Sequence, residues 1–429
     1  MTISGIRPLI FRGYGNSVVR RSLLLLCLMG PAFAVNLMLY YVASLSLSAE
    51  NFGHFYIAVT TVNVLYSASF VLNVFFTRYL VSVIRTMGEP AAYAATSRIQ
   101  MVVTRCGALG ATGCIVVLSG LGKWIGVESW SIVILIVLDA YAGYIVDVHR
   151  ALLQSLRKTM SLGSLTLCWM ILRFLLGSTG MYLFGTAWSG MLGTLLATVL
   201  VICVLLFLTC KGNAPPIELF AALPSVGELV PVTLGYVSLI AVSNLDVLLS
   251  YLLLKDDWLG AYSASSVFPK GILVFVTPLL QMLYPMMVGH EETLPSSRII
   301  LQKSVGMIFL LSSGMALSVF GFSGLLCGAP WGLKSCQPDA LHFLLISAVS
   351  LSMLRALVFY QSARGHDWMA LYMLVPVAAY VWIAVISSRA VETVAIQFTI
   401  FSVALLPYYG GLAFLLDRRR HNVGLRSAL

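Results

Sequence analysis

Twelve apolar stretches constrain this chain more than any other feature, because each is about 20 residues long, the length of a helix that crosses a lipid bilayer. Of the 429 residues, 59% are hydrophobic and only 10% are charged, whereas soluble domains carry about 25% charged residues. Helices are expected because a membrane strand needs only about half that length, and because lipid tolerates no unpaired backbone group. We predict an all-α integral membrane protein with about 12 transmembrane helices. The stretches cover roughly residues 22–46, 53–76, 99–121, 130–148, 162–184, 187–209, 229–253, 259–288, 304–327, 340–362, 368–387 and 393–416.

The positive charges predict the orientation of the chain. Most of the 26 Lys and Arg residues fall on one side when alternate connections are assigned to that side, including the basic cluster Arg418, Arg419 and Arg420. Cytoplasmic connections carry such an excess, so both termini are expected in the cytoplasm, with the protein in a bacterial inner membrane. The net charge of +10 reflects this bias and suits an anionic inner leaflet of membrane lipids, so nucleic-acid binding need not be invoked.

An internal repeat divides the chain into two halves. Gly53 and Gly260 lie 207 positions apart, and the same offset relates Gln154 to Gln361 in "QSLRK" and "QSARG". Two patches that share one offset without a gap favour duplication of a six-helix unit. An even number of helices gives both halves the same orientation, which is typical of transporters whose site lies between the halves. The predicted parts are a cytoplasmic N-terminal segment 1–21, a first half 22–209, a cytoplasmic linker 210–228, a second half 229–416 and a basic cytoplasmic tail 417–429.

Short motifs at equivalent places carry a family resemblance. The first span is followed by "ENFGHFYIA" and the seventh by "DDWLGAYSA", each with an acid, a hydrophobic residue, Gly and an aromatic in that order, and the seventh span contains "SNLDVLL". The sequence resembles the multidrug, oligosaccharidyl-lipid and polysaccharide (MOP) exporter superfamily, and within it the Wzx-type flippases of polysaccharides and lipid-linked oligosaccharides. The resemblance implies a V-shaped pair of six-helix lobes around a central cavity, lined largely by helices one, two, seven and eight.

Polar side chains within those helices are the candidates for substrate binding. Asn36, Asn63 and Asn244 lie in the first, second and seventh spans, and Lys270 takes the place of Asn63 in the repeat. Lys270 follows Pro269, where the missing donor weakens the helix. A buried cation facing a cavity suits the pyrophosphate of a lipid carrier. Arg355 is a second candidate, with snorkelling towards the inner face as its alternative.

Two acid–base pairs are expected at similar depths in the membrane. Asp246 and Lys270 could meet across neighbouring helices, and Asp139 and Arg173 share the middle of the fourth and fifth spans. Ionisable groups cost about 2.5–3.5 kcal/mol in hydrocarbon, so each should be paired or face water. Either pair could merely hold helices together. Asp246 could instead bind a proton or sodium ion and couple it to the substrate.

The remaining chemistry-bearing residues indicate neither a metal centre nor an enzyme. The eight cysteines lack metal-ligand spacing and the six histidines are scattered, so no catalytic residue, metal site or cofactor is expected. Cys327 and Cys336 flank a short connection on the outer side, where an oxidising compartment would allow a disulfide.

Three functions compete. The first is a transporter that moves a polysaccharide or lipid-linked oligosaccharide outwards across the inner membrane by alternating access, with a glycan polymerase and co-polymerase as possible partners. The second is a small-molecule or drug exporter. The third, a membrane glycan polymerase or ligase, usually needs a sizeable outer loop, and the outer connections of this chain are short.

Overall fold

The computed structural model describes residues 7–125, 130–156, 158–209, 226–288, 294–328, 333, 335–363, 367–387 and 390–427, and all regular structure within them is helical. Six helices form the first half. They are α1 (Arg7–Ser46), α2 (Ala49–Met87), α3 (Glu89–Ile125), α4 (Trp130–Ser155), α5 (Thr159–Phe184) and α6 (Ala187–Thr209). The second half contains α7 (Val226–Leu253), α8 (Asp256–Val288), α9 (Leu294–Gly321), α10 (Ser323–Cys327), α11 (Pro338–Ala363), the 3₁₀ helix η2 (Asp367–Met373), α12 (Leu374–Ile386) and α13 (Val391–Ser427).

Ten of the twelve predicted spans fall within one continuous helix each. The stretch 304–327 does not, because α9 stops at Gly321 and the chain turns at Phe322 before the short helix α10. The stretch 368–387 begins as η2 and becomes α-helical at Leu374. The predicted linker lies largely outside the described residues. Duplication and the exact domain boundaries stay predictions.

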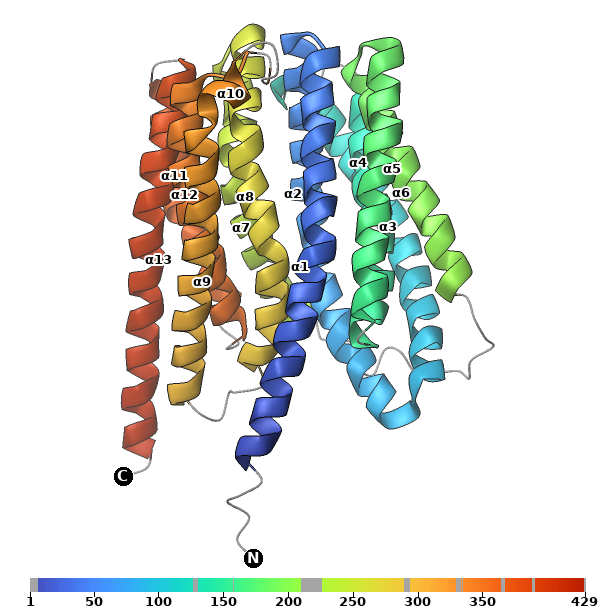
Figure 1. Ribbon diagram of the computed structural model, residues 1–429, viewed down its shortest axis with the longest axis vertical. Coiled ribbons are helices and arrows are strands. Elements are labelled where there is room, and N and C mark those ends of the chain that lie inside the picture. Colours follow the sequence, from blue (N-terminus) through green and yellow to red (C-terminus); the bar gives the residue numbers. More distant parts are fainter. Residues whose placement is uncertain are drawn as a thin grey trace, which may run out of the picture.

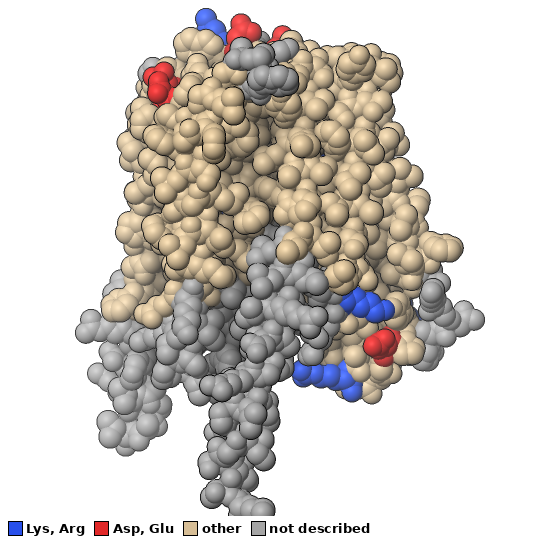
Figure 2. Space-filling view, in the orientation of Figure 1, with Lys and Arg blue, Asp and Glu red and all other residues tan. Residues whose placement is uncertain are grey.

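The surface of the molecule agrees with a multi-pass membrane protein. Ten helices in the described part of the chain are long and apolar enough to cross a bilayer by length and composition. Large apolar side chains are exposed along them, among them Leu109, Phe207, Leu310 and Phe414. On the face drawn in Figure 2, the charged side chains that are coloured lie towards the two ends and leave the middle band uncharged. Such a band suits the hydrocarbon core of a bilayer.

The two six-helix halves lie side by side, and their helices pack in the same order (Figure 1). In the first half α2 packs on α4, α1 on α5 and α4 on α6. The second half repeats this with α8 on α11, α7 on η2 and α11 on α13. Between the halves, α2 contacts α7 and α8, and α1 contacts α8. Both marked chain ends lie at the same end of the molecule, as an even number of spans requires.

Local signals explain several helix ends. Ser48 precedes α2, and its hydroxyl accepts a hydrogen bond from the Asn51 amide at 3.2 Å, which is a standard N-cap. Gly88, with φ 85°, ends α2 and begins the turn into α3. With 39 residues α2 is about 58 Å long, well beyond the roughly 30 Å of a hydrocarbon core. The α2–α3 hairpin therefore extends past the ends of α5 and α6 (Figure 1).

The connection after α10 is tied down at the end of the molecule opposite the termini. Cys327 and Cys336 form a disulfide, with Cα atoms 4.9 Å apart. Directly after it, the Gln337 amide donates a hydrogen bond to the Ser265 hydroxyl of α8 at 2.9 Å. The disulfide that the sequence allowed is thus present, and it anchors the connection to the second half.

Candidate binding cavity

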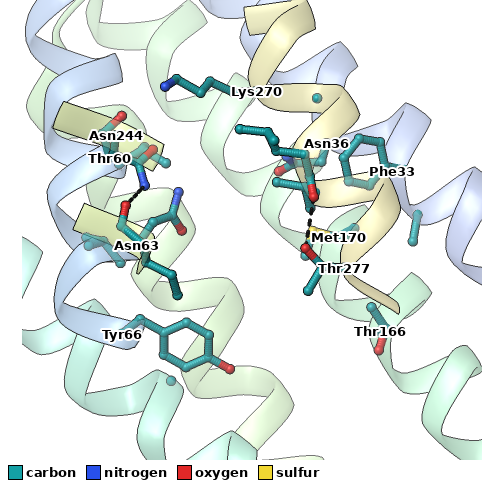
Figure 3. A pocket seen from close by; sticks show the side chains of 18 of the residues that line it. Phe33, Asn36, Thr60, Asn63, Tyr66, Thr166, Met170, Asn244, Lys270 and Thr277 are labelled. Carbon is teal, nitrogen blue, oxygen red and sulfur yellow. Dashed lines mark hydrogen bonds between the residues drawn. The ribbon is translucent and has the colours of Figure 1, made fainter. Parts of the chain in front are cut away.

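A cavity of about 310 Å³ lies between the two halves, within the described part of the chain. Its walls come from α1, α2, α7 and α8, as the family resemblance implied, but α4, α5 and α11 also contribute. The additional helices α4, α5 and α11 matter because each contributes an arginine to the cavity wall, namely Arg150, Arg173 and Arg355. Figure 3 shows part of this wall, with Asn36, Asn63, Asn244 and Lys270 around the opening.

Lys270 of α8 lines the cavity and is held by α7. Its ammonium lies 2.5 Å from the Asp246 carboxylate and also donates to the Ser243 carbonyl oxygen. The Asp246 side chain is 0% exposed, whereas the Lys270 side chain is 15% exposed. On the other side the Tyr262 hydroxyl donates to Asp246 at 3.0 Å, and the Phe398 ring centroid lies 5.0 Å from the ammonium. The expected meeting of Asp246 and Lys270 is therefore present, with the acid behind the base.

Arg355 of α11 lies on the same side of the cavity but has different surroundings. Its guanidinium donates to the Leu273 carbonyl at 3.0 Å and to the Thr277 hydroxyl at 3.1 Å, both on α8. Its Nε is buried without a hydrogen-bond partner. Among the described residues it forms no ion pair, and the hydrogen-bond partners that the structure gives it there are neutral. The guanidinium therefore reaches across to α8, and whether it also extends towards the inner face stays an open prediction.

Three asparagines add uncharged polar groups to the walls. Asn36 of α1, Asn63 of α2 and Asn244 of α7 all line the cavity, together with Thr60. The Asn244 amide donates to the Ile240 carbonyl at 2.8 Å, which fixes its orientation. Figure 3 shows Thr60, Asn63 and Asn244 gathered on one wall. Amide groups donate and accept hydrogen bonds at once, which suits hydroxyl-rich ligands.

The opposite wall, in the first half, contains a connected set of charged and aromatic side chains. Arg173 lies 3.8 Å from Asp139, and Asp139 accepts a hydrogen bond from Thr198 at 2.9 Å. The Trp169 ring lies near two guanidinium groups, with its centroid 5.8 Å from that of Arg173 and 6.0 Å from that of Arg150. Cations at such distances from a ring centroid are attracted by its negative face. The expected pair of Asp139 and Arg173 is thus part of a larger cluster.

Arg150 is the site residue that the sequence analysis missed. Counting connections placed it among the cytoplasmic cations, but α4 continues to Ser155 and keeps Arg150 inside the helix. There it pairs with Asp147 at 3.3 Å and donates to Thr166 at 3.2 Å. The spacing of three residues between Asp147 and Arg150 places both on one helix face, and this was the available signal.

The cavity carries an excess of positive charge. Four cations line it, namely Arg150, Arg173, Lys270 and Arg355, against the two acids Asp139 and Asp147. Counting the buried Asp246 as well leaves the described walls with one cation more than acids. No group of three or more His, Cys, Asp or Glu suited to a metal ion occurs among the residues that the structure describes. The arrangement can attract an anion and hydrogen-bond a polar, uncharged group beside it.

Known proteins resemble this chain in structure and not in sequence. No protein-family model and no curated protein matches the chain. Among solved structures, an inward-facing multidrug resistance MATE family transporter of the MOP superfamily superposes with a TM-score of 0.70 at 13% identity, over 93% of this chain and 96% of that one. A mutant form of the Vibrio cholerae MATE transporter VcmN gives a TM-score of 0.69 at 15% identity, over 94% of this chain and 98% of that one.

A third similar structure is a MOP superfamily transporter from Pyrococcus furiosus, with a TM-score of 0.66 at 14% identity, over 94% of this chain and 95% of that one. Identities this low are informative about the fold alone. In every case almost the whole of both chains is covered. The chain therefore adopts, over nearly its full length, the fold of the MATE transporters of the MOP superfamily.

Proposed function

We propose that this protein is a MOP-superfamily transporter that moves an anionic, amphipathic glycan, such as a polysaccharide or a lipid-linked oligosaccharide, from the cytoplasmic to the outer face of the inner membrane by alternating access. The observation that carries the proposal is Arg355, a cation at the cavity wall with no acidic partner among the described residues. An ionised group in a membrane protein is costly unless something balances it. A phosphate brought by the substrate would supply the missing counter-charge.

The guanidinium of Arg355 has hydrogen-bond donors that could bind the oxygens of a phosphate group. A guanidinium has five donors in a planar fork, and here two hydrogen bonds use one nitrogen while Nε has no partner. Parallel donors of this kind bind phosphate oxygens in pairs. Lys270 lies on the neighbouring helix and adds a second positive charge. The asparagines on the adjoining walls are placed to meet sugar hydroxyls beside the anion.

The similar structures support transport by alternating access. We infer the substrate from the residues that line the cavity. Inward-facing and outward-facing conformations are described for a multidrug resistance MATE family transporter with this fold. For the Pyrococcus furiosus protein, reverse polarity of the binding pocket is described as suggesting a different function. In that protein, the polarity of the pocket bears on function. In this chain, the cation-rich cavity favours anions as substrates.

The alternatives are weaker by the same reasoning. A drug exporter fits the fold equally well, but a cavity with a surplus of cations would repel positively charged drugs. A glycan polymerase or ligase would need catalytic groups that the described cavity walls do not bring together. We place the termini in the cytoplasm and expect membrane lipids, and a polymerase with its co-polymerase, as partners. Coupling to a proton or sodium ion at Asp246 remains part of the proposal.

Transport by the purified protein tests the proposal directly. Proteoliposomes would contain a fluorescent undecaprenyl-diphosphate oligosaccharide, and a lectin or quencher would report the leaflet it occupies. We expect wild-type protein to move the glycan, Arg355→Gln to lose most of this activity and Arg355→Lys to keep part of it. Arg105→Gln, at an exposed position of α3 that does not line the cavity, is the matched control. Equal transport by Arg355→Gln and wild type would remove the main support, and transport of a cationic dye instead would favour the drug exporter.

A further inference from the structure

The two glycines of the repeated motif face each other across the boundary between the halves. Gly53 lies one turn into α2 and Gly260 one turn into α8. A Cβ atom added to Gly260 would lie 2.3 Å from the Ala49 carbonyl oxygen of α2, and one added to Gly53 would lie 3.0 Å from the Leu259 side chain and 3.3 Å from the Gly260 nitrogen. The helices therefore cross at backbone contact, a closeness that only glycine permits.

The neighbouring motif residues hold each helix in its own half. Phe55 is fully buried, and its ring centroid lies 6.3 Å from that of Tyr40 on α1. Its counterpart Tyr262 is also fully buried and hydrogen-bonds Asp246 on α7. The aromatic of each motif thus anchors its helix within the half, while the glycine presents bare backbone to the other half. This division of roles explains why the same order of residues occurs twice.

The crossing lies near the first residues of α2 and α8, and both helices begin at the end of the molecule opposite the chain termini (Figure 1). Tyr56, three residues after Gly53, is the first residue of α2 that lines the cavity, and Val267 is the first of α8. The cap at Ser48 stabilises the first turn of α2, the turn that leads to Gly53. Access to the cavity from this end requires α2 and α8 to separate where the glycines now touch.

We infer that the contact between Gly53 and Gly260 is the gate that closes the cavity at this end, and that the repeated motif exists to let the two helices close on bare backbone. The inference rests on the proposed function only in requiring alternating access. A side chain at Gly260 would prevent closure and shift the protein towards a conformation open at this end. Gly53 would tolerate substitution better, because the atoms it would meet first belong to the flexible Leu259 side chain.

Distance measurements between spin labels test the gate without any substrate. Labels would be attached to cysteines replacing the exposed first-turn acids Glu50 and Asp257, with the free cysteines changed to serine and the Cys327–Cys336 disulfide kept. In liposomes, pulsed electron–electron double resonance would report the distance between the labels on α2 and α8. For wild type we expect a short distance to dominate. For Gly260→Leu we expect the ratio of short to long distances to fall about tenfold or more, since overpacking a tight contact is strongly disfavoured.

Three further variants provide the control and the milder substitutions that the test needs. Gly314→Leu, on α9 where an added Cβ meets no atom within 4 Å, is the matched control and should leave the distances unchanged. If Gly260→Leu does not fold, Gly260→Ala should produce a smaller shift in the same direction, and Gly53→Ala a smaller one still. An unchanged distance in folded Gly260 variants, or an equal shift in Gly314→Leu, would overturn the gate. The glycan transport assay is separate, so a responsive gate without glycan transport would refute the proposed substrate and leave the gate standing.

Discussion

The two walls of the cavity differ in how their cations are balanced. In the first half, Arg150 and Arg173 each have an acid on the same wall, at 3.3 and 3.8 Å, and both lie within about 6 Å of the Trp169 ring centroid. In the second half, Lys270 has its acid buried behind it, and Arg355 has none among the described residues. A cation balanced within its own wall adds little attraction for a ligand. We therefore expect anion binding in the second half and a structural role for the charges of the first.

The largest expected effect concerns the buried acid of the second wall. Replacing Lys270 with Met leaves Asp246 buried without a counter-charge, and breaking such a pair typically costs about 3–5 kcal/mol. We expect Lys270→Met to lower the free energy of unfolding by roughly this amount, measured by denaturant titration in mixed micelles. The double variant Lys270→Met/Asp246→Asn should recover most of the loss. If the double variant were as unstable as the single one, the ion pair would not be the cause.

Replacing Arg355 should affect ligand binding more than stability, the opposite of what we expect for Lys270. Its removal leaves no acid unpaired, so Arg355→Met should change the free energy of unfolding much less than Lys270→Met does. Binding should suffer instead, because hydrogen bonds to a charged group contribute about 1.5–3 kcal/mol. We expect Arg355→Gln to weaken binding of inorganic pyrophosphate about tenfold to a hundredfold in calorimetric titrations.

The corresponding change in the first wall sharpens this contrast. The double variant Arg173→Gln/Asp139→Asn should alter pyrophosphate affinity by less than about threefold, since it removes both charges of a balanced pair and keeps the net charge of the wall. Equal losses for this double variant and for Arg355→Gln would show that both walls bind the anion, and the proposed division between them would be wrong.

Trp169 tests whether the first wall is structural. Replacing it with Leu removes a ring that two guanidinium groups contact, at about 0.5–2 kcal/mol for each contact. We expect Trp169→Leu to destabilise the protein by about 1–3 kcal/mol in the same unfolding assay while pyrophosphate affinity stays unchanged. A selective loss of affinity in a stable variant would instead place the tryptophan in the binding site.

A modest effect is expected at Asn63, which faces the cavity and is exposed there. A single hydrogen bond contributes about 0.5–1.5 kcal/mol net, so Asn63→Ala should slow transport of the glycan-bearing lipid only about twofold to tenfold. Transport of undecaprenyl diphosphate without the glycan should be unaffected, because the amide is assigned to sugar hydroxyls. Loss of both activities together would contradict that assignment.

Much of the molecule could be predicted from local patterns. The lengths of the apolar stretches predicted the twelve spans, because the thickness of a bilayer imposes one length on every helix that crosses it. The spacing of Asp246 and Lys270 along adjacent helices predicted that they could meet, since helical rise converts sequence position into depth. Depth alone, however, gives no direction around a helix axis. Whether Arg355 faced the cavity or the inner surface could not be decided from its position.

What the sequence by itself determined was the approximate number of apolar spans and most of the charges within them, because these depend on length and on the cost of charge in lipid. Only the tertiary structure decided which charges share a wall. It brought Arg150 into the cavity by continuing α4 to Ser155, and it left Arg355 with neutral partners on α8. It also set Gly53 against Gly260. Contacts between helices depend on rotation and crossing, which arise only when both surfaces pack together.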